Sequence, residues 1–92
     1  MNLFWSSAAW DDYVEFRENN PPLAKKIHDL IADIRRTPFA GMGKPEPLRG
    51  PLSGWWSRRI NQEHRLVYRV AGTHGRDQRL EILQCRFHYG KR

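Results

Sequence analysis

Apolar residues between positions 23 and 34 follow the spacing of one face of an α-helix. They recur three or four positions apart, with one adjacent pair, and so lie on a single stripe along the helix. The members of this stripe are Leu23, Ile27, Leu30, Ile31 and Ile34. Charged residues occupy the other sides of the same helix, and Pro38 stops it. The pattern predicts an amphipathic helix that packs one face against a core.

A shorter helix is predicted ahead of this one. Residues 2–5 are apolar enough to form a strand, and the hydroxyls of Ser6 and Ser7 can then cap a helix that starts with the next residues. The acidic pair at 11–12 falls in the first turn of that helix, where carboxylates suit the helix dipole. The Asn-Asn-Pro-Pro run at 19–22 ends the helix.

The second half of the chain changes to the rhythm of β-strands. Residues 55–60, 65–71 and 80–89 are predicted strands, and the turn-rich segments 61–64 and 72–78 separate them. Together with the N-terminal strand they predict an α+β fold. In this fold two N-terminal helices pack on a mostly antiparallel four-stranded sheet, in the order β-α-α-β-β-β.

The alternation of side chains assigns the two faces of the sheet different characters. The residues expected on the helix-covered face are apolar: Leu66, Tyr68, Val70, Leu83, Cys85 and Phe87. The open face is expected to carry basic residues, namely Arg65, Arg69, Arg86 and His88, with Arg58 or Arg59 added according to the register of the preceding strand. Such a face suits an acidic partner, although arginines there could also serve only to keep the sheet soluble.

The composition fits a single domain, 1–92, with an affinity for polyanions. Sixteen Lys and Arg against ten Asp and Glu give a formal charge of +6, and the pI is near 10.1. This charge favours nucleic acid or ribosome as a partner. The single cysteine, Cys85, excludes an internal disulfide framework. The chain shows neither a signal-peptide pattern nor an apolar run of membrane-spanning length, so we expect a cytoplasmic protein without membrane contact.

The segment 38–51 contains four prolines and three of the seven glycines, so it is predicted to be a loop. Glu46 lies in this loop with a proline on each side, which could present its carboxylate stiffly to the open face. A loop carboxylate is more often only solvated. His88 and Tyr89 close the last predicted strand, where the imidazole could donate a proton and the phenol could stack on a base. Such a pair can also be simple packing.

A metal site or another cofactor is not expected. The candidate ligands His28, His64, His74, His88 and Cys85 show none of the paired spacings of metal sites. No glycine loop that could cradle a phosphate is present either. Cys85 belongs to the predicted core face, so it is a poor candidate for a nucleophile.

Six stretches of the chain, in order, resemble the YoeB/Txe branch of the RelE-like toxins of type II toxin–antitoxin systems. They are residues 5–12, 35–39, 43–48, 52–60, 63–68 and 85–89. The resemblance implies a RelE-like, microbial-ribonuclease-like fold. It also implies a ribosome-dependent endoribonuclease that cleaves mRNA in the A site without a metal, through attack of the ribose 2′-hydroxyl on the adjacent phosphate, and so inhibits translation.

The resemblance also implies roles for individual residues. Glu46 would accept the 2′-hydroxyl proton, and His88 would protonate the leaving 5′-oxygen. Arg65 would stabilise the charge of the phosphorane, and Tyr89 would orient the nucleotide. Three further basic residues would contact RNA phosphates: Lys44, Arg49 and Arg59. Relatives often have lysine where this chain has Arg49, and the two side chains differ in geometry.

The implied partners are a YefM/Phd-like antitoxin, the 70S ribosome and mRNA, with operator DNA bound only through the antitoxin. Monomer and homodimer both remain open. Two other functions are consistent with the basic face, namely a non-catalytic module that blocks ribosomes by occupancy and an antitoxin-bound transcriptional co-regulator. Two features depart from the family pattern, a longer turn at 72–78 and a short basic tail at 90–92 after the His-Tyr pair.

Overall fold

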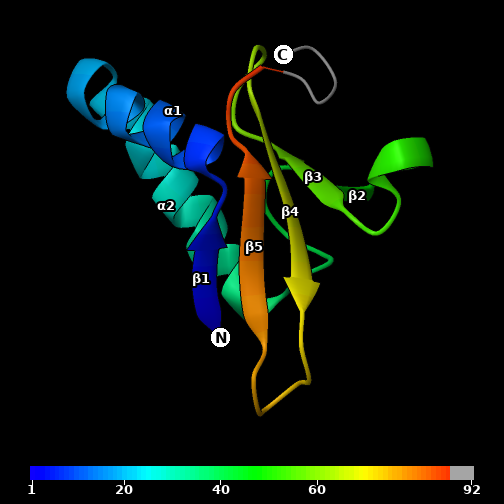
Figure 1. Cartoon of the computed structure of the whole chain (residues 1–92). Coiled ribbons are helices and arrows are strands. Elements are labelled where there is room, and N and C mark those ends of the chain that lie inside the picture. The colour runs from blue at the N-terminus through cyan, green and yellow to red at the C-terminus, as the bar shows by residue number, and fades with distance from the viewer. Residues whose placement is uncertain (88–92) are drawn as a thin grey trace.

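Two helices cover one face of a five-stranded sheet in the computed structural model, which describes residues 1–87 (Figure 1). The elements are β1 (Asn2–Trp5), α1 (Ser7–Asn19), α2 (Pro21–Arg36), β2 (Glu46–Pro47), a short 3-10 helix (Gly50–Leu52), β3 (Trp56–Arg59), β4 (Arg65–Ala71) and β5 (Arg79–Gln84). The strand order is β1-β5-β4-β3-β2; β1 runs parallel to β5, and the other neighbours are antiparallel. The predicted α+β class is confirmed, with one strand more than the four expected.

The helix boundaries follow from their capping residues. The Ser6 hydroxyl accepts a hydrogen bond from the Ala9 N–H at 3.0 Å, which confirms the predicted cap of α1. Because α1 starts at Ser7, the acidic pair at 11–12 lies beyond the first turn, and that part of the prediction is wrong. The Asn-Pro-Pro run that ends α1 also starts α2, since Asn20 caps α2 and prolines fill its first positions.

The predicted apolar stripe of α2 forms the centre of the core. All five of its residues are buried, and they pack with α1 and with the inner face of β4 and β5. The sheet contributes Leu66, Tyr68, Leu80 and Ile82. Burying a side chain of this size stabilises the fold by about 1.5–3 kcal/mol.

The last predicted strand is shorter and less regular than its sequence indicates. It ends at Gln84, and the pairing with β4 shifts so that Tyr68 faces Ile82 while Val67 faces Gln84. Leu83 is the extra residue of this β-bulge, which reverses the side-chain alternation. Cys85 is therefore buried as predicted, whereas Leu83 lies outside the core cluster.

The bulge also turns Arg86 away from the open face, where it had been predicted. Its guanidinium lies 3.2 Å from the Glu15 carboxylate and 3.5 Å from that of Asp12, both on α1. It also lies over the ring of Phe16 at 5.6 Å. Arg86 thus ties the chain after β5 to the helical layer and is not part of the open basic face.

Within residues 1–87, neither helix is long and apolar enough to cross a membrane.

Candidate active site

Glu46 and Arg65, nineteen positions apart in sequence, meet on the open face of the sheet. The Arg65 Nη2 atom lies 3.3 Å from Glu46 Oε1. Arg65 also donates from Nε to the Ser57 hydroxyl, at 2.5 Å. The arginine side chain is 11% exposed and that of Glu46 is 51% exposed. A largely buried, oriented guanidinium therefore sits beside a carboxylate that solvent and substrate can reach.

The strand β2 explains how Glu46 reaches this position. The sequence predicted only a loop here, but two residues pair with β3, with Glu46 opposite Ser57 and Pro47 opposite Trp56. Because β2 is an edge strand, it tolerates a proline that cannot donate a ladder hydrogen bond. The pairing fixes the register of the carboxylate relative to Arg65.

The loop that leads to β2 is held in place by hydrogen bonds from one fully buried arginine. Arg58 donates from Nη1 to Asp33 Oδ2 at 2.6 Å and from Nε to the Tyr68 hydroxyl at 3.1 Å. Its remaining hydrogen bonds go to the loop carbonyls of Thr37, Ala40 and Met42. These contacts use the whole guanidinium fork. The predicted loop thus wraps around the Arg58 guanidinium. The hydrogen bonds fix the direction in which the chain leaves the loop towards Glu46.

Asp33 completes this buried arrangement. Its carboxylate accepts the Met42 N–H at 2.9 Å in addition to the Arg58 bond. These hydrogen bonds, that from Met42 first, hold the pKa of Asp33 below its ordinary value. Burial and the Asp33 charge have the opposite effect on Tyr68, whose pKa is raised, with desolvation the largest cause.

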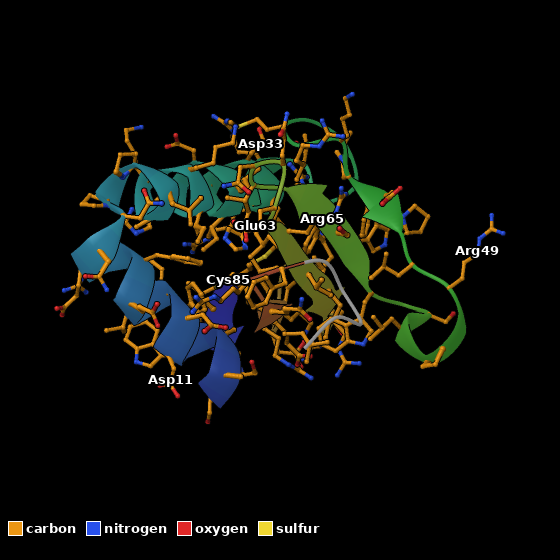
Figure 2. All side chains as sticks on the ribbon, turned by 90° about the horizontal axis from the view of Figure 1, so that it is seen from above. Asp11, Asp33, Arg49, Glu63, Arg65 and Cys85 are labelled. Carbon is orange, nitrogen blue, oxygen red and sulfur yellow. The ribbon has the colours of Figure 1, made fainter. Side chains whose placement is uncertain are left out.

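The register of β3 decides which arginine joins the open face. Arg59 is exposed and lies opposite Arg65 in the β3–β4 ladder, whereas Arg58 points inward. Lys44 and Arg49 are exposed on either side of Glu46 in the chain. Arg49 helps to line an open hollow of about 490 Å³ with residues 46–48, and its side chain extends away from Arg65 (Figure 2). The structure thus groups Glu46, Arg59 and Arg65, with Arg49 at the periphery.

The open face continues along β4 as a charged row. Arg69 lies over the Trp55 ring at 4.5 Å and pairs with Glu81, which also binds Arg79 at 2.7 Å. The hydrogen bond from Arg79, followed by that from Arg69, keeps the pKa of Glu81 below its ordinary value. Arg69 therefore lies on the face predicted for it, with part of its charge neutralised.

His88 and Tyr89, predicted as site residues, lie outside the described residues. The chain up to Phe87 is fixed beside Arg65: the Arg65 N–H donates to the Phe87 carbonyl at 3.1 Å, and the Phe87 N–H donates to His64 Nδ1 at 2.8 Å. In the sequence, His64 stands out only as a candidate metal ligand and as part of the stretch 63–68, and neither feature indicates this contact. Its position directly before Arg65 is the one sequence feature that could have drawn attention to it.

Within the described residues, the site contains groups suited to proton transfer and charge stabilisation, namely the Glu46 carboxylate and the Arg65 guanidinium. Among residues 1–87, no group of three or more His, Cys, Asp or Glu side chains is arranged to hold a metal ion. A carboxylate can accept a proton, and an adjacent guanidinium can stabilise negative charge that develops beside it. The pair suits acid–base chemistry on an anionic substrate.

Comparison with known proteins agrees with this combination of fold and site. Residues 5–89 match the family described as the YoeB-like toxin of the bacterial type II toxin–antitoxin system. The sequence is 55% identical to the YoeB toxin of Escherichia coli strain K12 over 89 residues, which span 97% of this chain and 100% of that protein.

Solved structures are similar over the same length. A YoeB/ParE toxin from Agrobacterium tumefaciens superposes with a TM-score of 0.91 at 55% identity, covering 97% of this chain and 100% of the other. A YoeB dimer and a heterotetrameric YoeB–YefM complex, both from Staphylococcus aureus, give TM-scores of 0.86 and 0.85 at 42% identity, covering 97% of this chain and 98% of theirs.

The fold and the sequence matches together define a toxin of a bacterial type II toxin–antitoxin system. Within that class, the chain belongs to the YoeB family.

Proposed function

We propose that this toxin is a ribosome-dependent endoribonuclease that cleaves mRNA in the A site and so stops translation. The observation that carries the proposal is the contact between the accessible Glu46 carboxylate and the oriented Arg65 guanidinium. A general base beside a fixed cation on an open basic face suits the cleavage of a phosphodiester. The family resemblance supplies the ribosome as the place of action.

In the proposed reaction, Glu46 accepts the proton of a ribose 2′-hydroxyl. The 2′-oxygen then forms a bond to the adjacent phosphorus, and the bond from phosphorus to the 5′-oxygen of the next nucleotide breaks. His88 donates a proton to that leaving oxygen. Arg65 stabilises the extra negative charge of the phosphorane, which is greatest midway between the two steps. The products are a 2′,3′-cyclic phosphate and a 5′-hydroxyl, and no metal or other cofactor takes part.

Substrate binding is assigned to the surrounding basic and aromatic residues. Arg59 lies opposite Arg65 and is free to contact a neighbouring phosphate, and the exposed Lys44 and Arg49 extend the charge along the loop. Tyr89 is assigned to orient the nucleotide. The formal charge of +6 favours association with ribosomal and messenger RNA.

The proposed regulatory partner is a YefM-like antitoxin, as in the S. aureus complex. This antitoxin would connect the toxin to operator DNA. Antitoxin and ribosome would meet the toxin in the cytoplasm.

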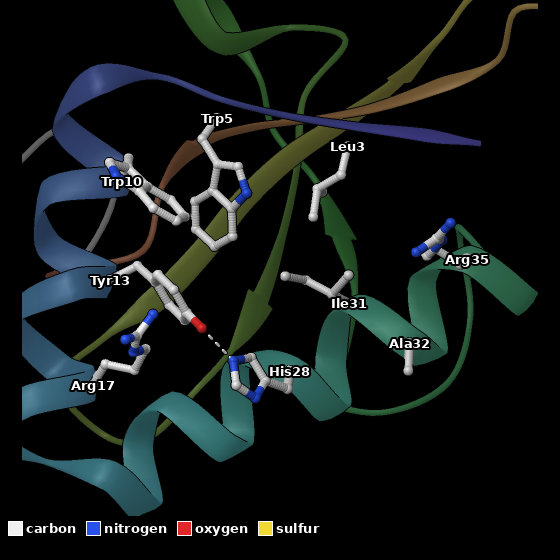
Figure 3. A pocket seen from close by; sticks show the side chains of 9 residues that line it. All are labelled: Leu3, Trp5, Trp10, Tyr13, Arg17, His28, Ile31, Ala32 and Arg35. Atoms are coloured by element: carbon white, nitrogen blue, oxygen red, sulfur yellow. Dashed lines mark hydrogen bonds between the residues drawn. The ribbon is translucent and has the colours of Figure 1, made fainter.

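For self-association, the candidate surface is an apolar hollow of about 340 Å³ where β1, α1 and α2 meet (Figure 3). Trp5, Trp10 and Tyr13 pack there with ring centroids 4.9–5.7 Å apart, next to the edge strand β1. Sedimentation velocity over a range of concentrations distinguishes monomer from dimer.

The cleavage proposal is tested by primer extension on an mRNA translated by purified 70S ribosomes. The wild type is expected to cut at ribosome-occupied codons, and Glu46→Ala and His88→Ala are each expected to lower the rate by about 10²–10⁴-fold. The matched controls are Glu18→Ala and His74→Ala, which remove the same side chains from exposed positions on α1 and in the 72–78 turn.

The alternative of a non-catalytic ribosome-binding module gives a different result in the same assay. Its basis is the exposed basic surface alone, so translation would stop without cuts, and the Glu46 and His88 variants would inhibit as well as the wild type. Cyclic-phosphate ends at the cut sites, detected by enzymatic end analysis, belong only to the catalytic mechanism.

A further inference from the structure

We infer that His64 is a positioning residue whose imidazole fixes the backbone of Phe87 against Arg65 and thereby sets the start of the segment that carries His88. This inference rests on the proposed function, in which Arg65 and His88 act on the same phosphate. Phe87 is bound at both ends of its peptide backbone by two consecutive residues. Its N–H donates to His64 Nδ1 at 2.8 Å, and its carbonyl accepts from the Arg65 N–H at 3.1 Å.

His64 is itself held firmly enough to act as an anchor. The Asn61 side chain accepts the His64 N–H at 2.7 Å, and the His64 carbonyl accepts the N–H of Ile60 at 3.0 Å. The imidazole packs against two rings, with its centroid 5.2 Å from that of Phe16 on α1 and 5.5 Å from that of Phe87. The residue is 6% exposed. Backbone and ring are therefore fixed relative to both the helical layer and the sheet.

The conformation of Phe87 shows why an anchor is needed. Its φ angle is +60°, a left-handed conformation that bulky residues rarely adopt. Such a conformation persists only when surrounding contacts impose it. The bond to His64 Nδ1 is one of these contacts, and it requires that Nδ1 carry no proton. The proton of the neutral ring then lies on Nε2, which faces the Glu63 carboxylate at 3.3 Å.

The anchor bears on catalysis because the residues it connects are neighbours of the proposed catalytic groups. His64 directly precedes Arg65, and Phe87 directly precedes His88. A general acid must be within hydrogen-bond reach of its leaving oxygen, and a displacement of about 1 Å can lower the rate by about 10²-fold. Losing the His64 bond therefore acts on the chemical step and leaves the basic surface that binds RNA unchanged.

The test compares two substitutions that both remove the imidazole ring. They differ in where the new side chain places a hydrogen-bond acceptor. In His64→Asn the amide oxygen occupies the place of Nδ1, whereas in His64→Gln the amide lies near the place of Nε2. We expect His64→Asn to retain single-turnover cleavage on 70S ribosomes. His64→Gln is expected to cleave at least about tenfold more slowly than His64→Asn. The concentration of toxin at half-saturation should be the same for both, and both variants should remain folded at the assay temperature. Equal cleavage rates for the two variants would overturn the inference.

A second measurement uses the wild type and needs no ribosome. A hydrogen bond from the Phe87 nitrogen to His64 Nδ1 produces a scalar coupling between the two ¹⁵N nuclei, which NMR detects directly. We expect this coupling at neutral pH, and its absence would overturn the inference even if neither variant folds. Failure of the proposed function itself looks different, because the wild type would then make no cuts. If the wild type cuts, and cleavage depends on Glu46 but not on the acceptor at position 64, the proposed function stands and only the role of His64 is refuted.

Discussion

At the scale of single residues, Arg58 and Arg59 show how one step along a strand decides between two roles. Arg58 points into the molecule, is 0% exposed and binds Asp33, Tyr68 and three loop carbonyls. Arg59 points outward, opposite Arg65. The inner arginine shapes the loop before Glu46, and the outer one is available to a substrate.

Replacing the inner arginine is therefore expected to unfold the loop, and replacing the outer one to leave stability intact. Arg58→Met removes the buried cation that lies 2.6 Å from Asp33 Oδ2 and leaves this carboxylate with only the exposed Arg36, 3.3 Å from Oδ1. Breaking a buried pair in this way costs about 3–5 kcal/mol. The control Arg59→Met should change the free energy of unfolding by less than about 0.5 kcal/mol. Urea unfolding measured by circular dichroism compares the two. A loss below about 1 kcal/mol in Arg58→Met would mean that water replaces the guanidinium.

At the scale of elements, the loop between α2 and β2 depends on a glycine for close contact with β3. The Gly43 carbonyl accepts the Arg59 N–H at 2.7 Å. The φ angle of Gly43 is +77°, and a Cβ atom there would lie 2.9 Å from the Arg59 carbonyl and 3.0 Å from Leu30 Cδ2. Only glycine allows this approach without displacing the strand. The position of Glu46, three residues later, depends on it.

Gly43→Ala is expected to destabilise the protein more than Gly54→Ala does. Gly54 also has a positive φ, +94°, but nothing lies within 4 Å of its Cβ position. Its substitution therefore measures the conformational strain alone, about 1–2 kcal/mol. The excess in Gly43→Ala measures the clash with β3 and with Leu30 of α2. The proposed mRNA cleavage should fall as well because Glu46 is displaced. Equal unfolding free energies for the two variants would contradict the steric argument.

The sequence predicts the elements whose signals are local. The stripe of α2, the Ser6 cap and the strand 65–71 are all confirmed, because periodicity and capping depend on neighbours in the chain. The predicted strand 80–89 is too long, because the apolar Leu83 occupies a bulge that only pairing with β4 creates. The strand β2 has two residues, too few for any pattern to appear.

For the candidate site, the sequence named residues but not their geometry, and the assignment of these residues stays a prediction. The resemblance named Glu46 and Arg65, and the contact between them arises from the pairing of β2, β3 and β4. The choice between Arg58 and Arg59 needed the same register. The contact of His64 with Phe87 joins a turn to a segment 23 positions away. Such contacts are tertiary, and spacing along the chain carries no sign of them.

At the scale of the whole molecule, the excess of positive charge is distributed unevenly. Several carboxylates are committed to internal partners: Asp33 binds Arg58, Glu81 binds Arg69 and Arg79, and Asp12 and Glu15 bind Arg86. Arg59, Lys44 and Arg49 lie exposed around Glu46. Part of the net charge of +6 is thus available to a polyanion near the candidate site, while the internal pairs fix the loop and the sheet.

These committed carboxylates make the stability of the whole molecule sensitive to acid. Asp77 joins them, since its carboxylate accepts the Thr73 N–H at 2.7 Å. The pKa values of Asp33, Asp77 and Glu81 are all lowered, in each case chiefly by hydrogen bonds to the carboxylate. The unfolded chain, with ordinary pKa values near 3.8 and 4.5, then binds more protons than the folded chain at low pH. The free energy of unfolding should therefore be constant above about pH 5 and fall as the pH drops towards the lowered values.

Urea unfolding at a series of pH values between about 6 and 2 measures this dependence. Asp33→Asn should be less stable than the wild type at pH 6 and should show a shallower loss of stability towards low pH, because one of the linked protons is gone. High salt should weaken the exposed pair of Arg69 and Glu81 more than the buried pair of Arg58 and Asp33, since buried charges are screened less. An acid dependence that is the same in the wild type and in Asp33→Asn would show that the loop carboxylate does not contribute to it.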